Sequence, residues 1–136
     1  MSNKTDIFYM KKALDLAKKG RGKVSPNPLV GAIMVTKEGQ IVGQGWHEYF
    51  GGPHAELNAI NNVEDKTLLK GATIYVTLEP CCHYAKTPPC AEAIINTQIK
   101  RVVIAMTDPN PAVNGSGIKI LRENGLQVEV GVLEQE

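Results

Sequence analysis

The alternation of short apolar runs with segments of helical spacing limits the fold of this chain more than any other feature. The apolar runs lie at residues 29–35, 41–47, 72–78, 101–106 and 127–133. Helical spacing occurs in residues 6–19, 90–99 and 118–124, and a further helical segment begins near His54. Strands that alternate with helices predict a three-layer α/β/α fold, in which helices cover both faces of one five-stranded sheet.

The connections between the apolar runs predict that the sheet is mixed. Only the turn KEGQ separates the first two runs, so these should form a β-hairpin and pair antiparallel. The later runs are joined by helical segments, a connection typical of parallel strands. Turn residues mark the other breaks: Gly20 and Gly22 end the first helix, SPNP at 25–28 is a tight turn, and Gly125 ends the last helix.

Composition places the chain among ordinary globular proteins. Its 136 residues are 43% hydrophobic and 21% charged, with a net charge of +1. We therefore expect a single domain over residues 1–136, and no broad surface for nucleic acid. The apolar runs are too short to span a membrane, and the N-terminus lacks the apolar core of a signal peptide. These features predict a cytoplasmic protein that has no membrane partner.

The three cysteines, Cys81, Cys82 and Cys90, all fall within ten residues of one another. An odd number with two adjacent members makes a poor disulfide framework. In a chain without a secretion signal, such a cluster more often marks metal binding or catalysis.

One histidine and two of the cysteines occupy positions suited to hold zinc. His54 lies at the predicted start of one helix, Cys90 at the start of another, and Cys81 in the loop before that second helix. The positive end of a helix dipole favours thiolate over thiol. One imidazole and two thiolates form a three-ligand zinc site whose fourth position stays open for water, as catalytic zinc requires. The alternative is a closed structural site, to which Cys82 or His83 supplies the fourth ligand.

Glu56 follows His54 by two residues and is expected to play a different role. From the first turn of its helix, the carboxylate can reach the space beside the metal, take a proton from an attacking water and deliver it to a leaving amine. His-x-Glu followed by Pro-Cys is the signature of zinc deaminases, in which the glutamate is not a ligand. Each part alone has an ordinary alternative, because His-Ala-Glu is common in helices and a cysteine at a helix start is usually a small core residue.

Four stretches carry a resemblance to a known family: SPNPLVGAI, GWHEYFGGPHAE, TLEPCCHYAKTPPC and DPNPAVNGSGI. In these stretches the chain resembles the pyrimidine deaminases of riboflavin biosynthesis, within the cytidine-deaminase-like superfamily. The likeness runs from about residue 20 to residue 118. Other nucleobase deaminases carry Pro-Cys-x-x-Cys, whereas eight residues separate Cys81 from Cys90 here. This longer loop is similar to that of the riboflavin family.

The resemblance implies a reaction and a set of site residues. Members of the family hydrolyse the 2-amino group of 2,5-diamino-6-ribosylamino-4(3H)-pyrimidinone 5′-phosphate, giving 5-amino-6-ribosylaminouracil 5′-phosphate and ammonia. Carried over by position, it implies one Zn²⁺ per chain, with Glu56 as the proton shuttle and as ligands His54, Cys81 and Cys90. The positions that match substrate contacts of the family are Asn27, His47, His83, Lys86, Asp108 and Asn110.

The chemistry of these residue types suits a pyrimidine ribotide. The amide of Asn27 offers both a donor and an acceptor to the ring edge, Lys86 is a cation for the phosphate, and His47 can donate a hydrogen bond. Each also has an ordinary alternative. Asn27 and Asn110 precede prolines, where asparagine is a common turn residue. Asp108 can cap a turn, and Lys86 can be a solvated loop lysine.

Two features depart from the family pattern. This chain has Cys82 where members often carry a small residue, and we expect that thiol to face away from the metal. Many members continue into a C-terminal reductase domain that uses NADPH, whereas this sequence stops at VEVGVLEQE. A separate reductase polypeptide is therefore a candidate partner, unless the chain is an excised domain. The absence of a Gly-rich dinucleotide fingerprint predicts no nicotinamide cofactor, and the superfamily leads us to expect a homo-oligomer.

Two other functions are alternatives to pyrimidine deamination. A zinc deaminase acting on nucleic acid, such as a tRNA adenosine deaminase, is suggested by KKGRGK at 18–23, which has four cations in six residues. The simpler interpretation is that cations decorate the C-terminus of a helix, and an aromatic content of 5% disfavours a strand-binding surface. The second rival is a non-enzymatic zinc module for protein contacts, which would hold zinc with no open position.

Overall fold

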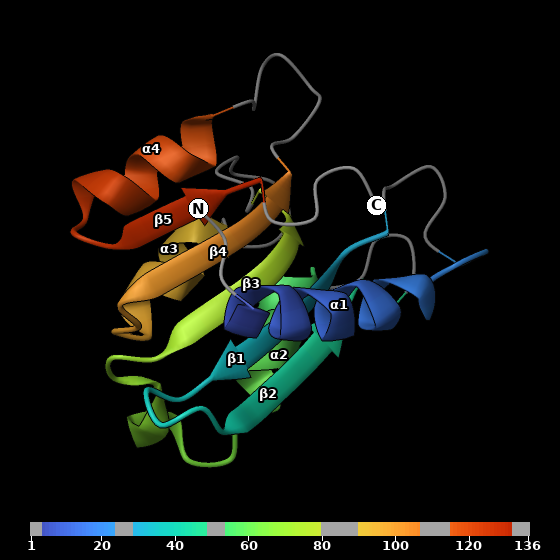
Figure 1. Ribbon diagram of the computed structural model, residues 1–136, viewed down its shortest axis with the longest axis horizontal. Coiled ribbons are helices and arrows are strands. Elements are labelled where there is room, and N and C mark those ends of the chain that lie inside the picture. Colours follow the sequence, from blue (N-terminus) through green and yellow to red (C-terminus); the bar gives the residue numbers. More distant parts are fainter. Residues whose placement is uncertain (1–3, 24–28, 49–53, 80–89, 107–114, 132–136) are drawn as a thin grey trace.

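A five-stranded mixed sheet organises the molecule, with helices on both of its faces (Figure 1). The computed structural model describes residues 4–23, 29–48, 54–79, 90–106 and 115–131. The strands are β1 (Gly31–Val35), β2 (Ile41–Trp46), β3 (Thr73–Leu78), β4 (Arg101–Met106) and β5 (Gln127–Val130). The helices are α1 (Lys4–Lys18), α2 (Ala55–Asn61), the 3₁₀-helix η1 (Lys66–Leu69), α3 (Cys90–Asn96) and α4 (Ser116–Glu123).

Strand order in the sheet is β2-β1-β3-β4-β5. Strand β1 pairs antiparallel with both β2 and β3, while β3, β4 and β5 are mutually parallel. Since β2 and β3 both run opposite to β1, the carboxyl ends of β2, β3, β4 and β5 all meet at one edge of the sheet. In open α/β sheets, ligands bind outside this edge. The predicted mixed sheet with its opening hairpin is confirmed.

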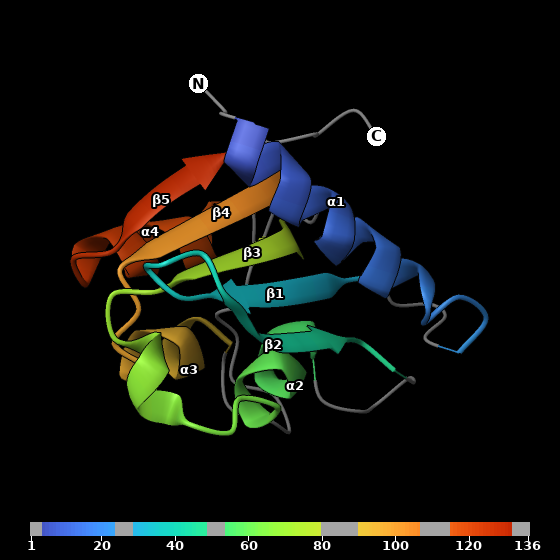
Figure 2. The same cartoon turned by 60° about the horizontal axis from the view of Figure 1, so that its bottom comes forward.

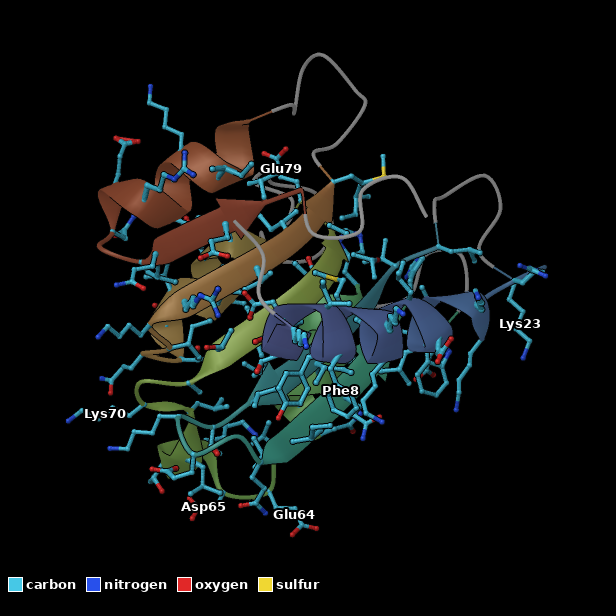
Figure 3. All side chains as sticks on the ribbon, in the orientation of Figure 1. Phe8, Lys23, Glu64, Asp65, Lys70 and Glu79 are labelled. Atoms are coloured by element: carbon cyan, nitrogen blue, oxygen red, sulfur yellow. The ribbon has the colours of Figure 1, made fainter. Side chains whose placement is uncertain are left out.

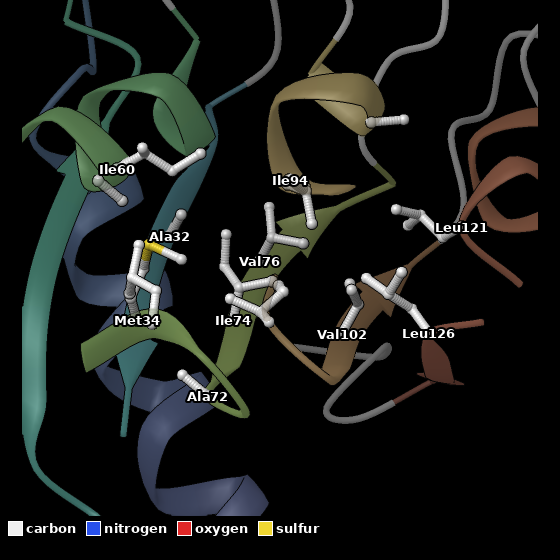
Figure 4. Packing of buried hydrophobic residues seen from close by; sticks show 14 of the residues in the cluster. Ala32, Met34, Ile60, Ala72, Ile74, Val76, Ile94, Val102, Leu121 and Leu126 are labelled. Carbon is white, nitrogen blue, oxygen red and sulfur yellow. The ribbon is translucent and has the colours of Figure 1, made fainter. Parts of the chain in front are cut away.

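The helices form two layers of unequal size (Figure 2). On one face, α2, α3 and α4 pack over the whole width of the sheet, around a core that includes Met34, Ile74, Val76, Ile94 and Leu121 (Figure 4). On the other face α1 is the one helix among the described residues; it lies over β1 and β3 and buries a second cluster with residues such as Met10, Ile33 and Val103. In the part of the chain that is described, no helix is both long and apolar enough to span a bilayer.

Glycines in the strands allow helices to approach the sheet closely. A Cβ atom on Gly31 of β1 would lie 2.1 Å from the carbonyl oxygen of Ala13 in α1. On the opposite face, a Cβ on Gly45 of β2 would lie 2.4 Å from the backbone nitrogen of Ala59 in α2. Real Cβ atoms do not approach other atoms this closely, so any larger residue would displace α1 or α2.

A buried ion pair joins α1 to strand β4. Asp6, which is 1% exposed, accepts hydrogen bonds from Nη1 of Arg101 at 2.8 Å, from Nη2 of Arg101 at 2.6 Å and from the Tyr75 hydroxyl at 2.7 Å. Nη2 of Arg101 also lies 2.8 Å from a carboxylate oxygen of Glu129 in β5. This network joins α1, β3, β4 and β5.

Element boundaries differ from the sequence-based expectations by a few residues. Helix α3 ends at Asn96 because Gln98 adopts the left-handed conformation with φ 67°, which an α-helix does not contain. Helix α1 begins two residues earlier than predicted, and α4 also begins two residues early, at Ser116. The η1 turn was not predicted; its first turn is capped by Asp65. The SPNP turn and the end of the predicted run 127–133 lie outside the described residues.

Candidate active site

His54 stands at the entry to α2, at the sheet edge where β2 ends. Its backbone is extended, with φ −71° and ψ 164°, and its carbonyl oxygen accepts a hydrogen bond from the Asn58 amide at 3.1 Å. The side chain of this N-cap residue makes no capping hydrogen bond to the helix. His54 therefore begins the helix through its backbone and not through its side chain.

Two asparagines fix α2 against the outer strand of the sheet. Nδ2 of Asn58 donates to the Trp46 carbonyl at 2.8 Å, and Nδ2 of Asn62 donates to the Gln44 carbonyl at 2.7 Å. Strand β2 lies at one edge of the sheet and pairs with β1 on one side. These two carbonyls lie on its other side, where none of the described strands pairs with them, and they accept hydrogen bonds from α2 instead. Together with the close approach at Gly45, these bonds set the position of the helix N-terminus.

Glu56 lies in the first turn of α2 and is only 3% exposed. The positive end of the helix dipole stabilises a carboxylate at this position. A carboxylate so deeply buried would be costly without polar interactions, and Glu56 does have an interacting partner in the structure. The predicted proton shuttle is thus a buried carboxylate two residues after the N-cap histidine.

His47 lies beside His54, although seven positions separate them in the chain. It directly follows β2, is 4% exposed, and donates its backbone N–H to the Val30 carbonyl at 3.0 Å. The two imidazole rings meet edge to face, with 5.5 Å between their centroids and 88° between their planes. The structure therefore brings a predicted substrate contact next to a predicted metal ligand.

Of the remaining predicted site residues, the structure describes only Cys90. Cys90 is the first residue of α3, which packs beside α2 on the same face of the sheet. Since α3 links the parallel strands β3 and β4, it begins at the edge where His54 lies. The other predicted residues fall outside the described residues: Asn27, Cys81, Cys82, His83, Lys86, Asp108 and Asn110.

The chemistry of the predicted ligands fits zinc. One imidazole, at the start of α2, and two cysteines, of which Cys90 begins α3 and Cys81 follows β3 by three residues in the sequence, are the donor types of zinc centres with an open position. Among the residues that the structure describes, no cluster of three His, Cys, Asp or Glu side chains exists that could hold a metal. The proposed set depends on Cys81, which is not among them.

A separate groove of about 620 Å³ lies between α1 and the carboxyl ends of β3 and β4. Lys11, Lys18 and Arg21 lie along it, with apolar residues between them. It is on the α1 side of the sheet, and none of the predicted site residues that the structure describes lines it.

Glu79 is a polar residue of this edge to which sequence reasoning gave no role. It lies between β3 and Cys81, is 3% exposed, and its carboxylate accepts hydrogen bonds from the start of α4. These partners lie 36 and 38 positions away in the sequence. No local pattern indicates a contact of that range.

Comparison with known proteins gives the same family from the sequence and from the fold. The sequence profile of the family described as "Cytidine and deoxycytidylate deaminase zinc-binding region" matches residues 3–106. The diaminohydroxyphosphoribosylamino-pyrimidine deaminase of Buchnera aphidicola subsp. Schizaphis graminum is 49% identical over 131 residues, covering 96% of this chain and 87% of that protein.

Longer relatives match over only part of their length. Riboflavin biosynthesis protein RibD of Aquifex aeolicus is 55% identical over 136 residues, all of this chain but 37% of that protein. The structure of a diaminohydroxyphosphoribosylaminopyrimidine deaminase/5-amino-6-(5-phosphoribosylamino)uracil reductase of Thermotoga maritima superposes with a TM-score of 0.90 and 52% identity, over 96% of this chain and 37% of that one. The chain thus spans little more than a third of these relatives.

Proposed function

The chain belongs to the zinc-binding deaminases of riboflavin biosynthesis, within the cytidine and deoxycytidylate deaminase family, and from this membership we propose that it deaminates 2,5-diamino-6-ribosylamino-4(3H)-pyrimidinone 5′-phosphate. The products are 5-amino-6-ribosylaminouracil 5′-phosphate and ammonia. The observation that carries the proposal is the position of His54, at the N-cap of α2, beside a buried Glu56 two residues later in the first turn of that helix. We propose that residues 1–136 form one such deaminase domain.

Three side chains of this chain would hold one zinc ion: His54, Cys81 and Cys90. Bound in such a site, zinc lowers the pKa of a coordinated water to about 7. The positive end of the α3 dipole favours the thiolate form of Cys90, which is the first residue of that helix. Cys82 remains, in our proposal, a spectator.

Glu56 moves the proton that the hydrolysis requires. Its carboxylate takes a proton from the attacking water, whose oxygen forms a bond to the ring carbon that bears the 2-amino group. Glu56 then gives this proton to the amine nitrogen, the carbon–nitrogen bond breaks, and ammonia leaves. Burial keeps bulk water from Glu56, so the same proton can be taken up and returned.

The substrate is recognised, in this proposal, by side chains around the same edge. His47 stands beside His54 and can donate a hydrogen bond to the ribotide. Asn27 faces the pyrimidine edge and Lys86 the phosphate, and we propose further contacts from His83, Asp108 and Asn110. The protein is expected to act in the cytoplasm, where a reducing environment keeps the thiols available, as a homo-oligomer with a separate reductase as candidate partner.

The structure adds an argument against the nucleic-acid rival. Of the cations in KKGRGK, Lys19 lies over the Trp46 ring, with its Nζ 5.0 Å from the ring centroid. Lys18 lies 4.0 Å from Asp15, one turn earlier on α1. Both cations thus have intramolecular partners, which supports the interpretation that they end a helix.

An ammonia-release assay tests the proposal. Zinc-loaded protein is given the diaminopyrimidine ribotide and, in parallel, cytidine, deoxycytidine and guanine. We expect kcat/KM for the ribotide to exceed the others by at least about a hundredfold, because a site that hydrogen-bonds its substrate strongly rejects analogues lacking the matching groups. Equal or greater turnover of any of the other three compounds would contradict the substrate assignment.

A further inference from the structure

Asn58 bonds to the backbone beside both histidines of the site. Its backbone N–H donates to the His54 carbonyl at 3.1 Å, at the start of α2. Its side-chain Nδ2 donates to the Trp46 carbonyl at 2.8 Å. That carbonyl belongs to the peptide group whose N–H is the amide of His47. The two bonds thus join the first residue of the α2 segment to the residue that directly follows β2.

The peptide group between Trp46 and His47 is held on both of its sides. Its N–H donates to the Val30 carbonyl at 3.0 Å, just before β1, and its carbonyl accepts from Asn58 of α2. Because a peptide group is planar, these two bonds fix the direction in which the chain enters His47. The imidazole of His47 is buried, and its centroid lies 5.5 Å from that of His54.

Asn62 makes the same kind of bond at the other end of α2. Its Nδ2 donates to the Gln44 carbonyl at 2.7 Å. Figure 3 shows Glu64, which follows the end of α2, well away from Glu79, which follows β3 at the carboxyl edge of the sheet. Asn62 therefore holds the end of the helix that is far from the predicted site, whereas Asn58 bonds to the backbone of the site itself.

We propose that Asn58 is a positioning residue that sets the affinity of the site for the pyrimidine ribotide by holding His47 beside His54. This inference rests on the proposed function, because it takes His47 as a substrate contact. Substrate affinity falls in proportion to the fraction of molecules whose binding residues are in the competent arrangement. Asn58 itself takes no part in the proton transfers, so its loss should weaken binding and leave the chemical step nearly unchanged.

The test compares N58D with wild type and with N62D. Aspartate has the shape of asparagine and keeps the side-chain acceptor, so N58D loses the N–H donor to Trp46 and gains one negative charge. N62D makes the same exchange, with the same added charge, at the far end of the same helix. For each protein, KM and kcat for ribotide deamination, the zinc content, and hydrogen exchange at the His47 amide are measured.

A double-mutant cycle with H47A distinguishes positioning from general support of the fold. If Asn58 acts through His47, then N58D raises KM in the wild-type background but has no further effect once the His47 imidazole is gone. A substitution that only loosens the fold would raise KM by the same factor in both backgrounds.

For N58D we expect KM to rise about tenfold, kcat to stay within about threefold, zinc to stay at the wild-type level, and exchange at the His47 amide to accelerate about tenfold. For N62D we expect KM and this exchange rate within about twofold of wild type. N58D combined with H47A should have a KM within about twofold of H47A alone. If N58D does not fold, N58A and N62A replace the pair with the same expectations, since alanine also lacks the donor.

Other results overturn the inference. An unchanged KM in N58D, an equal rise in KM in N62D, a loss of kcat together with zinc in N58D, or a further rise in KM when N58D is added to H47A would each contradict it. An H47A variant with the KM of wild type would also refute it, while the proposed function would stand. A wild-type protein that releases no ammonia from the ribotide would instead refute the proposed function, and the inference with it.

Discussion

Among the residues that the structure describes, three carboxylates are almost completely buried, and each is accommodated differently. Asp6 is 1% exposed, and Glu56 and Glu79 are each 3% exposed. Asp6 pairs with Arg101, and Glu79 accepts backbone N–H groups at the start of α4. Glu56 instead lies in the first turn of α2, at the edge where His47 and His54 meet. Two of the three thus have partners that connect elements of the fold, and the third is the proposed proton carrier.

The cysteines allow the ligand set to be tested one residue at a time. We expect C90S and C81S to lose the zinc, because each removes one of three ligands, while C82S retains it as the matched control. Metal analysis of the purified proteins measures this directly. Zinc retained in C90S at the wild-type level, or lost in C82S, would show that the assigned ligands are wrong.

The Asp6 network predicts how stability depends on pH. Burial alone would raise the pKa of Asp6, but hydrogen bonds from Arg101 and Tyr75 outweigh it and hold this pKa below its ordinary value of 3.8. A depressed pKa contributes stability in full above the unfolded-state value and loses it as the pH falls through the folded-state value. Stability should therefore fall more steeply below about pH 4 in wild type than in D6N.

At pH 7 we expect D6N to lower the free energy of unfolding by about 3 kcal/mol, because Arg101 loses its buried partner. The matched control is D15N, since Asp15 is exposed and lies 4.0 Å from Lys18, and such surface pairs contribute little. Denaturant unfolding across the pH range measures both effects. A D6N variant as stable as wild type at pH 7 would contradict this account of α1.

At the scale of elements, the fit of α2 against β2 decides where the site residues lie. The sequence pattern predicted the hairpin of β1 and β2, the helical segments and the parallel later strands, because each depends on residues close together in the chain. It did not indicate that Gly45 lets α2 approach, or that Asn58 and Asn62 bond to β2. Those contacts depend on how two elements meet.

In the site too, the sequence indicated local motifs but not contacts between elements. His54, Glu56 and the cysteines were predicted because their spacing carries a recognisable motif. The contact between His47 and His54 follows from the meeting of β2 and α2, and the role of Glu79 from the folding of β3 against α4. In such cases the residue type is ordinary, and the contact is visible only once the two elements are packed together.

G45A tests whether the fit of α2 positions the site. The added methyl group would lie 2.4 Å from the Ala59 nitrogen and 2.7 Å from the Ala55 carbonyl oxygen, so α2 must shift. We expect a loss of about 2 kcal/mol in unfolding free energy and a fall in kcat of at least about tenfold, since a displacement near 1 Å at a site is costly. Chemical denaturation and the deamination assay provide the two measurements.

The matched control is Q44A on the neighbouring residue of β2, whose side chain is exposed. We expect Q44A to leave both stability and turnover near wild type. A G45A protein with full activity, or a Q44A protein as impaired as G45A, would contradict the importance of this contact.

At the scale of the whole molecule, the sheet gathers every placed site residue at one edge. The carboxyl ends of β2 and β3 and the starts of α2 and α3 meet there, on the face that carries α2, α3 and α4. Helix α1 covers the opposite face and contributes stability through Asp6 rather than site residues. We therefore propose that hydrolysis of the substrate amine depends on this one edge, with Glu56 as the proton carrier.

The most direct test of that claim is turnover of the ribotide by E56Q at a measured zinc content, beside wild type and the exposed-site control E64Q. The account predicts that E56Q keeps its fold and its zinc but loses at least about a hundredfold in kcat, while E64Q matches wild type. Turnover by zinc-loaded E56Q within a few-fold of wild type would contradict it.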